Sequence, residues 1–366
     1  MPECVGAFPC LLTPSLTMAL IERDSHRWPL GLLLLLTGGA GTPLWAAPPA
    51  PAEHELPSAI DEASGLAQSG QHAALLWTHN DNINDPGSMQ RVTPLVHGID
   101  HEGRWLLSLE LDGVTQRDWE AIESVQIDGS HGLVVADTGD NRDSWPDYVL
   151  WFIDEPGDPP PSAKTLTTTP THLLRFSYPD GPADTEAMVV DPHGSQVLVL
   201  TKREDPPRLF ALPLSARQPF PDEGSPRERL ASAEVREARL LGPMGGLVPT
   251  DPINWLLSPL TGRQTSLPTG MALSPDGRLL AVLTYSSLYF FRRDAGERWS
   301  EAIRRPVASR SLPRIDQWEG IAFGRDASQL YIVREGTGPG TLLHLEVPEA
   351  ARVKHGSQTA KARGPD

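Results

Sequence analysis

The chain lacks the residues on which several common classes of function depend. Its two cysteines, Cys4 and Cys10, both precede an apolar run at residues 29–36. We expect that run to belong to a secretory signal, so the mature protein would have no disulfide, no reactive thiol and no thiolate ligand for zinc. Basic residues are also few, with 31 Lys and Arg against 47 Asp and Glu. The net charge of −16 argues against nucleic-acid binding and favours cationic ligands.

Long hydrophobic runs are missing as well. The run at residues 29–36 is too short for a membrane-spanning helix, but Arg23 and Arg27 before it and small residues after it are typical of a secretory signal. We assign residues 1–47 to an N-terminal extension with this signal, 48–54 to a linker and 349–366 to a disordered tail. The mature protein is expected to be a periplasmic or secreted monomer that does not bind a membrane.

What the chain does contain is a repeat. A residue with a side-chain oxygen precedes a Gly or Ala, and then come a short apolar strand, a tight turn and a more hydrophobic strand. Third and fourth strands are expected after these, in the second copy at residues 148–153 and 171–176. Four antiparallel strands per unit predict an all-β propeller over residues 55–348. The copies begin at Ser64-Gly65, Glu120-Ala121, Glu186-Ala187, Thr269-Gly270 and Glu319-Gly320.

The spacing of the copies bears on the number of blades. Their small residues are separated by 56, 66, 83 and 50 positions. The longest interval contains two apolar pieces, residues 238–241 and 253–257. We interpret it as one degenerate blade, which makes six blades, with five blades and a long insertion as the alternative. The last copy lacks a fourth strand, so we expect residues near 56–60 to supply it and close the ring.

Two segments resemble known propellers. Residues 118–122 (DWEAI) with 135–137 (VAD) and Asn141-Arg142 are similar to blades of six-bladed TolB-like and NHL-type propellers, and the turn 274–278 (SPDGR) is typical of bacterial ones. The whole pattern is loosely similar to phytase-like esterase domains. The resemblance implies a secreted bacterial propeller. It leaves the function open, because such folds host hydrolases, lactonases, quinoprotein dehydrogenases and binding modules.

The candidate site follows from the direction of the strands. The first strand of a blade starts where the antiparallel second strand ends, so both ends should meet at one mouth of the central channel. Glu120, Glu186 and Glu319 are the candidate metal ligands, with Ca²⁺ as the expected ion because it binds six to eight oxygens. Acids also stand two positions earlier, at Glu62, Asp118 and Asp184. The candidate ligand-binding residues in the loops are Asn80, Asp81, Asp140, Asn141, Arg142, Lys202, Tyr285, Arg334 and Glu335.

Two functions fit this arrangement. The first is the binding of a small molecule or a protein partner at the mouth, together with a divalent cation. The alternative is a cation-dependent hydrolase of the phosphoesterase or esterase kind, with His79, Glu120 and Glu186 as catalytic candidates. A purely structural role is the alternative to both functions. In that interpretation, the three glutamates cap turns or pair with Arg142, Lys202 or Arg334. His79 would then only form a hydrogen bond.

Overall fold

Short segments rich in β-branched and aromatic residues form most of the structure. The computed structural model describes residues 52–81, 93–157, 164–248, 266–312, 317–335 and 339–352. The expected signal, residues 353–366 of the expected tail and the apolar piece 253–257 lie outside these ranges. Within them, no helix has both the length and the apolar character that crossing a membrane requires.

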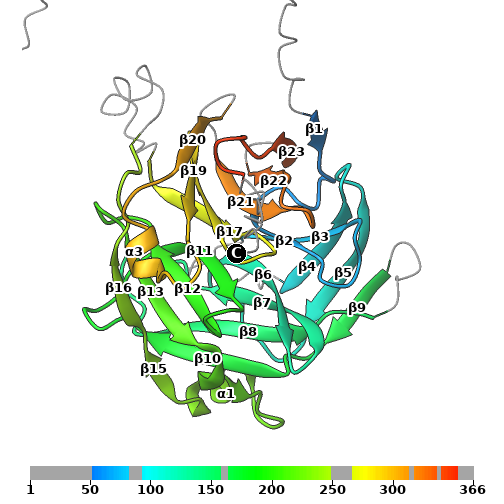
Figure 1. Cartoon of the computed structure of the whole chain (residues 1–366). Helices are drawn as coiled ribbons and strands as arrows, with labels where there is room; N and C mark the ends of the chain where they lie inside the picture. Colours follow the sequence, from blue (N-terminus) through cyan, green and yellow to red (C-terminus); the bar gives the residue numbers. More distant parts are fainter. Residues whose placement is uncertain are drawn as a thin grey trace, which may run out of the picture. The chain divides into compact units, whose positions relative to one another are not determined.

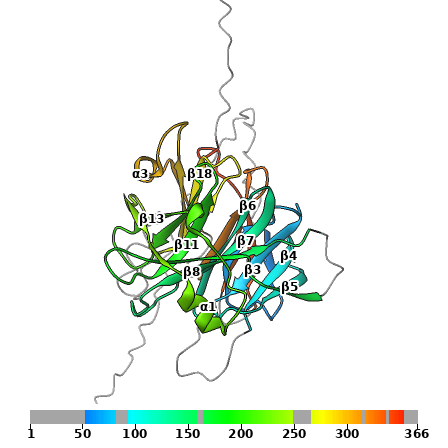
Figure 2. The ribbon, with the colours of Figure 1, turned by 90° about the horizontal axis from the view of Figure 1, so that it is seen from below.

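Five sheets account for the strands, and each sheet contains four strands that form one blade. Neighbouring strands within a blade lie side by side, as β3, β4 and β5 do in Figure 2. Blade 1 consists of β2 (Ala63–Gln68), β3 (Leu75–Asn80), β4 (Leu95–Asp100) and β5 (Trp105–Leu111). Blade 2 consists of β6 (Trp119–Ile127), β7 (Ser130–Asp137), β8 (Tyr148–Asp154) and β10 (His172–Ser177). Blade 3 consists of β11 (Thr185–Asp191), β12 (Gln196–Thr201), β13 (Arg208–Pro213) and β16 (Arg239–Pro243).

The ring is completed by two further blades. Blade 4 consists of β17 (Pro268–Leu273), β18 (Leu279–Thr284), β19 (Ser287–Arg292) and β20 (Ala308–Ser311). Blade 5 consists of β21 (Trp318–Phe323), β22 (Gln329–Arg334), β23 (Thr341–Glu346) and, from the other end of the chain, β1 (Ala52–Glu55). The closing strand therefore comes from before the repeats, as expected, but slightly earlier than residues 56–60.

The first strands of the blades surround the centre of the ring (Figure 1). Each of β2, β6, β11, β17 and β21 contacts the next, and β21 contacts β2. The protein is therefore an all-β propeller with five blades. The expectation of six blades is wrong and the alternative of five is confirmed, because the apolar piece at residues 238–241 is not a blade of its own. It contributes to β16, the outer strand of blade 3.

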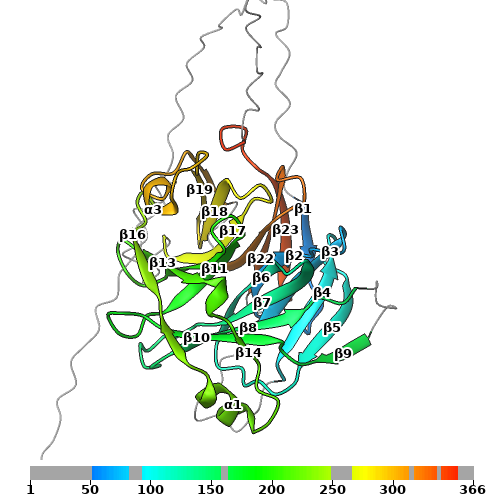
Figure 3. The same ribbon diagram turned by 60° about the horizontal axis from the view of Figure 1, so that its bottom comes forward.

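The long interval after blade 3 also adds strands to blade 2. Both β14 (Gln218–Pro219) and β15 (Val235–Glu237) pair with β10, and α1 (Pro226–Ser232) lies between them along the chain, outside blade 2 (Figure 3). A capping box at Ser225 and Glu228 starts this helix. The remaining elements of the described ranges are η1 (Leu214–Ala216), β9 (Lys164–Thr168), which pairs with β5, and α3 (Trp299–Ala302).

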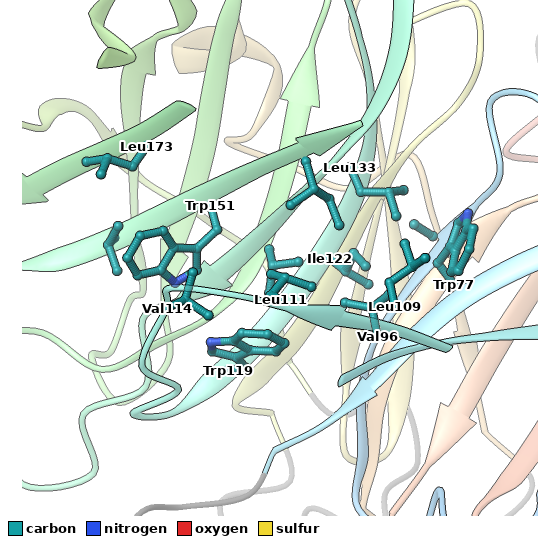
Figure 4. Packing of buried hydrophobic residues seen from close by; sticks show 14 of the residues in the cluster. Trp77, Val96, Leu109, Leu111, Val114, Trp119, Ile122, Leu133, Trp151 and Leu173 are labelled. Carbon is teal, nitrogen blue, oxygen red and sulfur yellow. The ribbon is translucent and has the colours of Figure 1, made fainter. Parts of the chain in front are cut away.

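Five apolar clusters hold the blades together, one at each contact between neighbours. The cluster between blades 1 and 2 joins Trp77 of β3 to Trp119 of β6 and Trp151 of β8 (Figure 4). Trp318 occupies the cluster between blades 4 and 5. Trp119 and Trp318, which precede matching glutamates in the repeat, are fully buried and pack between blades. Burying such side chains is the main force that stabilises the ring.

Candidate functional site

A β-bulge stands at the start of every innermost strand. The pairing of each first strand with the second shifts by one or two residues, and the residues that drop out of register are the oxygen-bearing ones of the repeat. A bulge leaves its extra residue unpaired and re-aims the side chain. The same local device therefore presents one polar side chain per blade at one end of the channel. These residues are Ser64 with Gly65, Glu120, Glu186, Thr269 and Glu319, and the five polar side chains belong to buried residues.

The loops that follow the second strands lie against these bulges. In four blades, a backbone hydrogen bond joins the loop to the start of the innermost strand. The donor is the N–H of the first residue after the second strand. The acceptor is the carbonyl oxygen of the residue two positions before Ser64, Glu120, Glu186 or Glu319. The pairs are Asp81 to Glu62 (2.8 Å), Thr138 to Asp118 (3.1 Å), Lys202 to Asp184 (2.9 Å) and Glu335 to Gln317 (3.0 Å). The structure thus brings together the two sets of residues that the strand directions predict to meet.

Two groups of carboxylates form at this mouth, and Glu120 belongs to both. One group is Asp81, Asp118 and Glu120, and the other is Glu120, Asp184 and Glu186. Within each group, carboxylate oxygens lie within 4.8 Å of one another. Glu319, predicted as a metal ligand, is in neither group. Asp118 and Asp184 are not among the predicted metal ligands, although the acid that recurs two positions before the repeat residue is the signal that could have found them.

The two groups differ in how their charge is compensated. In the second group, Lys202 forms an ion pair with Glu186, and the Nε of Arg203 lies 2.6 Å from Oδ2 of Asp184. Asp184 also accepts the N–H of Asp140 at 2.9 Å. Oxygens without a hydrogen-bond partner among the described residues occur in both groups, at Oδ1 of Asp81 and Asp118 and at Oε2 of Glu186. The first group has no ion pair with a Lys or Arg of the described residues. The first group is therefore the better candidate for a bound cation.

Burial and mutual repulsion keep protons on these carboxyl groups. Burial, followed by the neighbouring carboxylates, raises the pKa values of Asp81 and Glu120 well above their usual range. Burial, with the charges of Asp137 and Asp184, raises the pKa of Asp118 to about 7. Burial also raises the pKa of Glu319 to about 7, although Lys202 opposes this shift. The negative charge of Asp81, Asp118 and Glu120 is therefore costly at this mouth, and a proton or a bound cation would offset it.

Gly139 leaves room for the first group. A Cβ atom on this residue would overlap Oε1 of Glu120 and Oδ2 of Asp118. A residue with a Cβ atom at this position would therefore require the two carboxylates to shift.

The catalytic candidate His79 is in neither carboxylate group and lies between blades 1 and 2, where its Nε2 would be 2.5 Å from a Cβ atom on Gly65. Its residue is fully buried and its ring meets that of Trp119 edge to face, with the centroids 5.8 Å apart. Burial lowers its pKa to about 4, so the imidazole is neutral at physiological pH. The strand β3 continues to Asn80, two residues beyond the expected end, and this places His79 in the sheet rather than in the loop.

The remaining predicted ligand residues have varied positions. Lys202 lies over the Tyr285 ring, with Nζ 5.2 Å from its centroid, and Arg203 bonds to Asn141. The Asp140 carboxylate holds its own loop by accepting the Tyr148 hydroxyl at 2.9 Å and two backbone N–H groups. Arg142 is exposed. Three others bond to nearby groups: Asn80 to the Ala59 carbonyl, Arg334 to the Thr341 hydroxyl, and Glu335 to Gln317.

No protein-family model matches the chain, and no curated protein sequence matches it. Among solved structures it is similar to a candidate 6-phosphogluconolactonase from Bacteroides uniformis, with 15% identity over 81% of this chain and 70% of that chain and a TM-score of 0.37. A second candidate 6-phosphogluconolactonase, from Bacteroides fragilis, gives 12% identity over 79% and 68%, with a TM-score of 0.35. A nidogen/laminin complex gives 11% identity over 74% and 72%, with a TM-score of 0.36. Similarity at this level carries no function to this chain.

Proposed function

We propose that the acidic mouth binds Ca²⁺ through Asp81, Asp118 and Glu120, and that the bound ion holds a ligand or partner there. The observation that carries the proposal is the set of three acidic residues, Asp118 and Glu120 buried and Asp81 partly buried, whose oxygens approach within 4.8 Å. The Oδ1 atoms of Asp81 and Asp118 have no hydrogen-bond partner among the described residues. Ca²⁺ binds oxygens at about 2.3–2.6 Å, so oxygens up to about 5 Å apart can share one ion.

The charges around the mouth support this choice. Within the described residues, no Lys or Arg forms an ion pair with Asp81, Asp118 or Glu120, whereas Asp184 and Glu186 each have one. Three carboxylates offer six oxygens, and the remaining positions around a Ca²⁺ ion would be open to water or to an anionic group of a ligand. Lys202, which neighbours the same carboxylates, would assist in binding such an anion. We place the protein outside the cytoplasm, on the strength of the apolar run near its start.

Calorimetric titration with CaCl₂, together with thermal melting, tests the proposal. We expect Ca²⁺ to raise the melting temperature of the wild-type protein and Asp118→Asn to weaken Ca²⁺ binding at least about tenfold. Glu110→Gln removes one negative charge from β5, which β3 and β4 separate from the innermost strand β2, and should leave Ca²⁺ binding unchanged. If about 10 mM CaCl₂, a concentration that fills even weak extracellular sites, produces neither heat nor a change in melting temperature, the proposal is wrong.

A cation-dependent hydrolase is the second candidate. It is favoured by the two carboxyl groups of Asp118 and Glu319, whose pKa values of about 7 suit general acids or bases near neutral pH. In this function Ca²⁺ would orient a phosphate or carboxylate ester, and Glu319 would hold or release a proton beside Lys202. Hydrolysis of p-nitrophenyl phosphate and p-nitrophenyl acetate, with and without Ca²⁺, tests it. Turnover that Glu319→Gln abolishes without weakening Ca²⁺ binding would favour the hydrolase, and binding without turnover would favour the first function.

A further inference from the structure

The channel has a second chemical environment at its other end. A cavity of about 520 Å³ is lined there by residues of all five innermost strands, beyond the positions of the repeat residues. The carboxylates of the first mouth stand at the starts of the same strands, so the cavity does not share residues with the candidate Ca²⁺ site. Its volume is within the range of about 300–1,000 Å³ that small-molecule pockets occupy. Each innermost strand contributes to the lining, and the residues, in blade order, include Gln68, Glu123, Val190, Leu273 and Phe323.

The wall of this cavity combines an apolar surface with few charges. Val190, Leu214 and Phe323 contribute apolar area. The guanidinium of Arg325 is already engaged, because its Nη2 lies 3.1 Å from the carbonyl oxygens of both Ser69 and Gly70. In the described wall, the guanidinium of Arg325 therefore already has backbone acceptors when a ligand enters the cavity.

Glu123 is the acidic residue of this wall. It lies on β6, three residues beyond Glu120, and its Oε1 accepts the N–H of Ser124 at 2.9 Å. Within the described residues, no Lys or Arg forms an ion pair with it. A single carboxylate cannot supply the six to eight oxygens that a hard divalent cation requires. A partner that brings its own hydrogen-bond donors and a single positive charge suits this position better.

We propose that the cavity binds a small organic amine, whose ammonium group pairs with the Glu123 carboxylate while a short hydrocarbon body contacts Val190, Leu214 and Phe323. The net charge of −16 would raise the local concentration of such cations near the protein. An ion pair made inside a partly enclosed cavity is stronger than one at the open surface, because less water screens it.

Benzylamine and benzyl alcohol test the proposal as a pair, because they have nearly the same shape and differ in charge. By calorimetry at about pH 8, we expect benzylamine to bind the wild-type protein at least about tenfold more tightly than benzyl alcohol. Glu123→Gln should remove that preference, since Gln resembles the protonated acid and keeps the size of the side chain. Glu110→Gln, which removes a charge outside the cavity, should keep it. Equal affinities of the wild-type protein for the two compounds, or no binding of either, would overturn the proposal without any variant.

The pH dependence gives a second readout. Burial raises the pKa of Glu123 to about 8, so roughly 1% of it is ionised at pH 6 and half at pH 8. Amine binding that needs the ionised form should therefore strengthen about fiftyfold over this interval. Among the described residues that line the cavity, His131 and Arg325 are the other ionisable ones. His131→Gln should therefore retain the dependence, and its disappearance in this variant would contradict the assignment to Glu123. The amine should also bind when Ca²⁺ is saturating. That result would show that the amine does not occupy the candidate Ca²⁺ site at the first mouth.

Discussion

Gly139 shows how one missing side chain allows a site to form. The carboxylates of Asp118 and Glu120 occupy the space that a Cβ atom of residue 139 would fill. We predict that Gly139→Ala weakens Ca²⁺ binding at least about tenfold and costs about 1–3 kcal/mol of stability, because the two acids must move. Gly157→Ala is the matched control, since its Cβ would only meet Oε1 of Gln71 at 3.6 Å. Titration and urea unfolding of both variants measure the effect, and equal behaviour of the two would refute the steric role of residue 139.

The buried acids also predict how stability depends on pH. Asp118 has a pKa of about 7 in the folded protein and about 3.9 in an unfolded chain. Between these values the folded state binds more protons, so without Ca²⁺ the stability should fall as the pH rises from about 4 to about 7. Ca²⁺ replaces these protons, and its effect on the melting temperature should grow over the same interval. Calorimetric melting with CaCl₂ and with EDTA tests both trends. Asp118→Asn should flatten the slope of the Ca²⁺-free protein, and an unchanged slope would count against Asp118.

At the same scale, the sequence identified part of the mouth. The repeat pointed to Glu120 and Glu186 because their position recurs, and strand direction placed Asp81 and Lys202 near them. It could not show which acids approach one another, since that depends on bulges and on how neighbouring blades are rotated. It also gave no sign that His79 is buried. A strand that runs two residues further changes which side chains face the core.

Among the elements, buried carboxylates connect one blade to the next. Asp191 at the end of β11 accepts two hydrogen bonds from Arg293, which follows β19 in blade 4, at 2.7 and 3.1 Å, and one from Nε1 of Trp299 at 3.0 Å. Glu155 similarly accepts Nε1 of Trp77 at 2.7 Å between blades 2 and 1. Each carboxylate thus accepts a hydrogen bond from a donor on a neighbouring blade that would otherwise be buried without an acceptor.

We predict that Asp191→Ala destabilises the protein by about 3–5 kcal/mol, because Arg293 and the Trp299 indole lose their acceptor. The comparison is Glu102→Ala, which removes an ion pair with the exposed Arg104 and should cost less than about 1 kcal/mol. Urea unfolding gives both free energies. Similar values for the two variants would mean that the buried connection contributes no more than an exposed pair.

The elements also show where local pattern fails. The strands of the second repeat are close to their expected ranges, because short apolar runs and the turn at Asp128-Gly129 define them locally. The left-handed φ angles of these two residues, 53° and 84°, suit a two-residue hairpin turn. The predicted number of six blades was wrong because it depends on pairing between strands that are distant in the sequence. Only long-range pairing shows that residues 239–243 complete blade 3 while the strands before them join blade 2.

For the whole molecule, closure of the ring depends on four residues that precede the first repeat. Ala52 to Glu55 pair with His344 to Thr341, and most of their side chains face solvent. The contribution of β1 is therefore mainly backbone hydrogen bonding and protection of the edge of β23. An unprotected edge strand can pair with another chain.

A chain that starts at residue 56 should consequently show two defects that a chain starting at residue 52 does not. We predict a loss of about 2–4 kcal/mol from the missing hydrogen bonds, which lowers the melting temperature by roughly 3–6 °C in a protein of this size. We also predict concentration-dependent dimers formed through β23, visible in light scattering after gel filtration. A synthetic peptide with the sequence of residues 50–56 should reverse both defects by occupying the vacant edge. If the shorter chain melts like the longer one and stays monomeric, the ring is held by its interblade cores alone and β1 is dispensable.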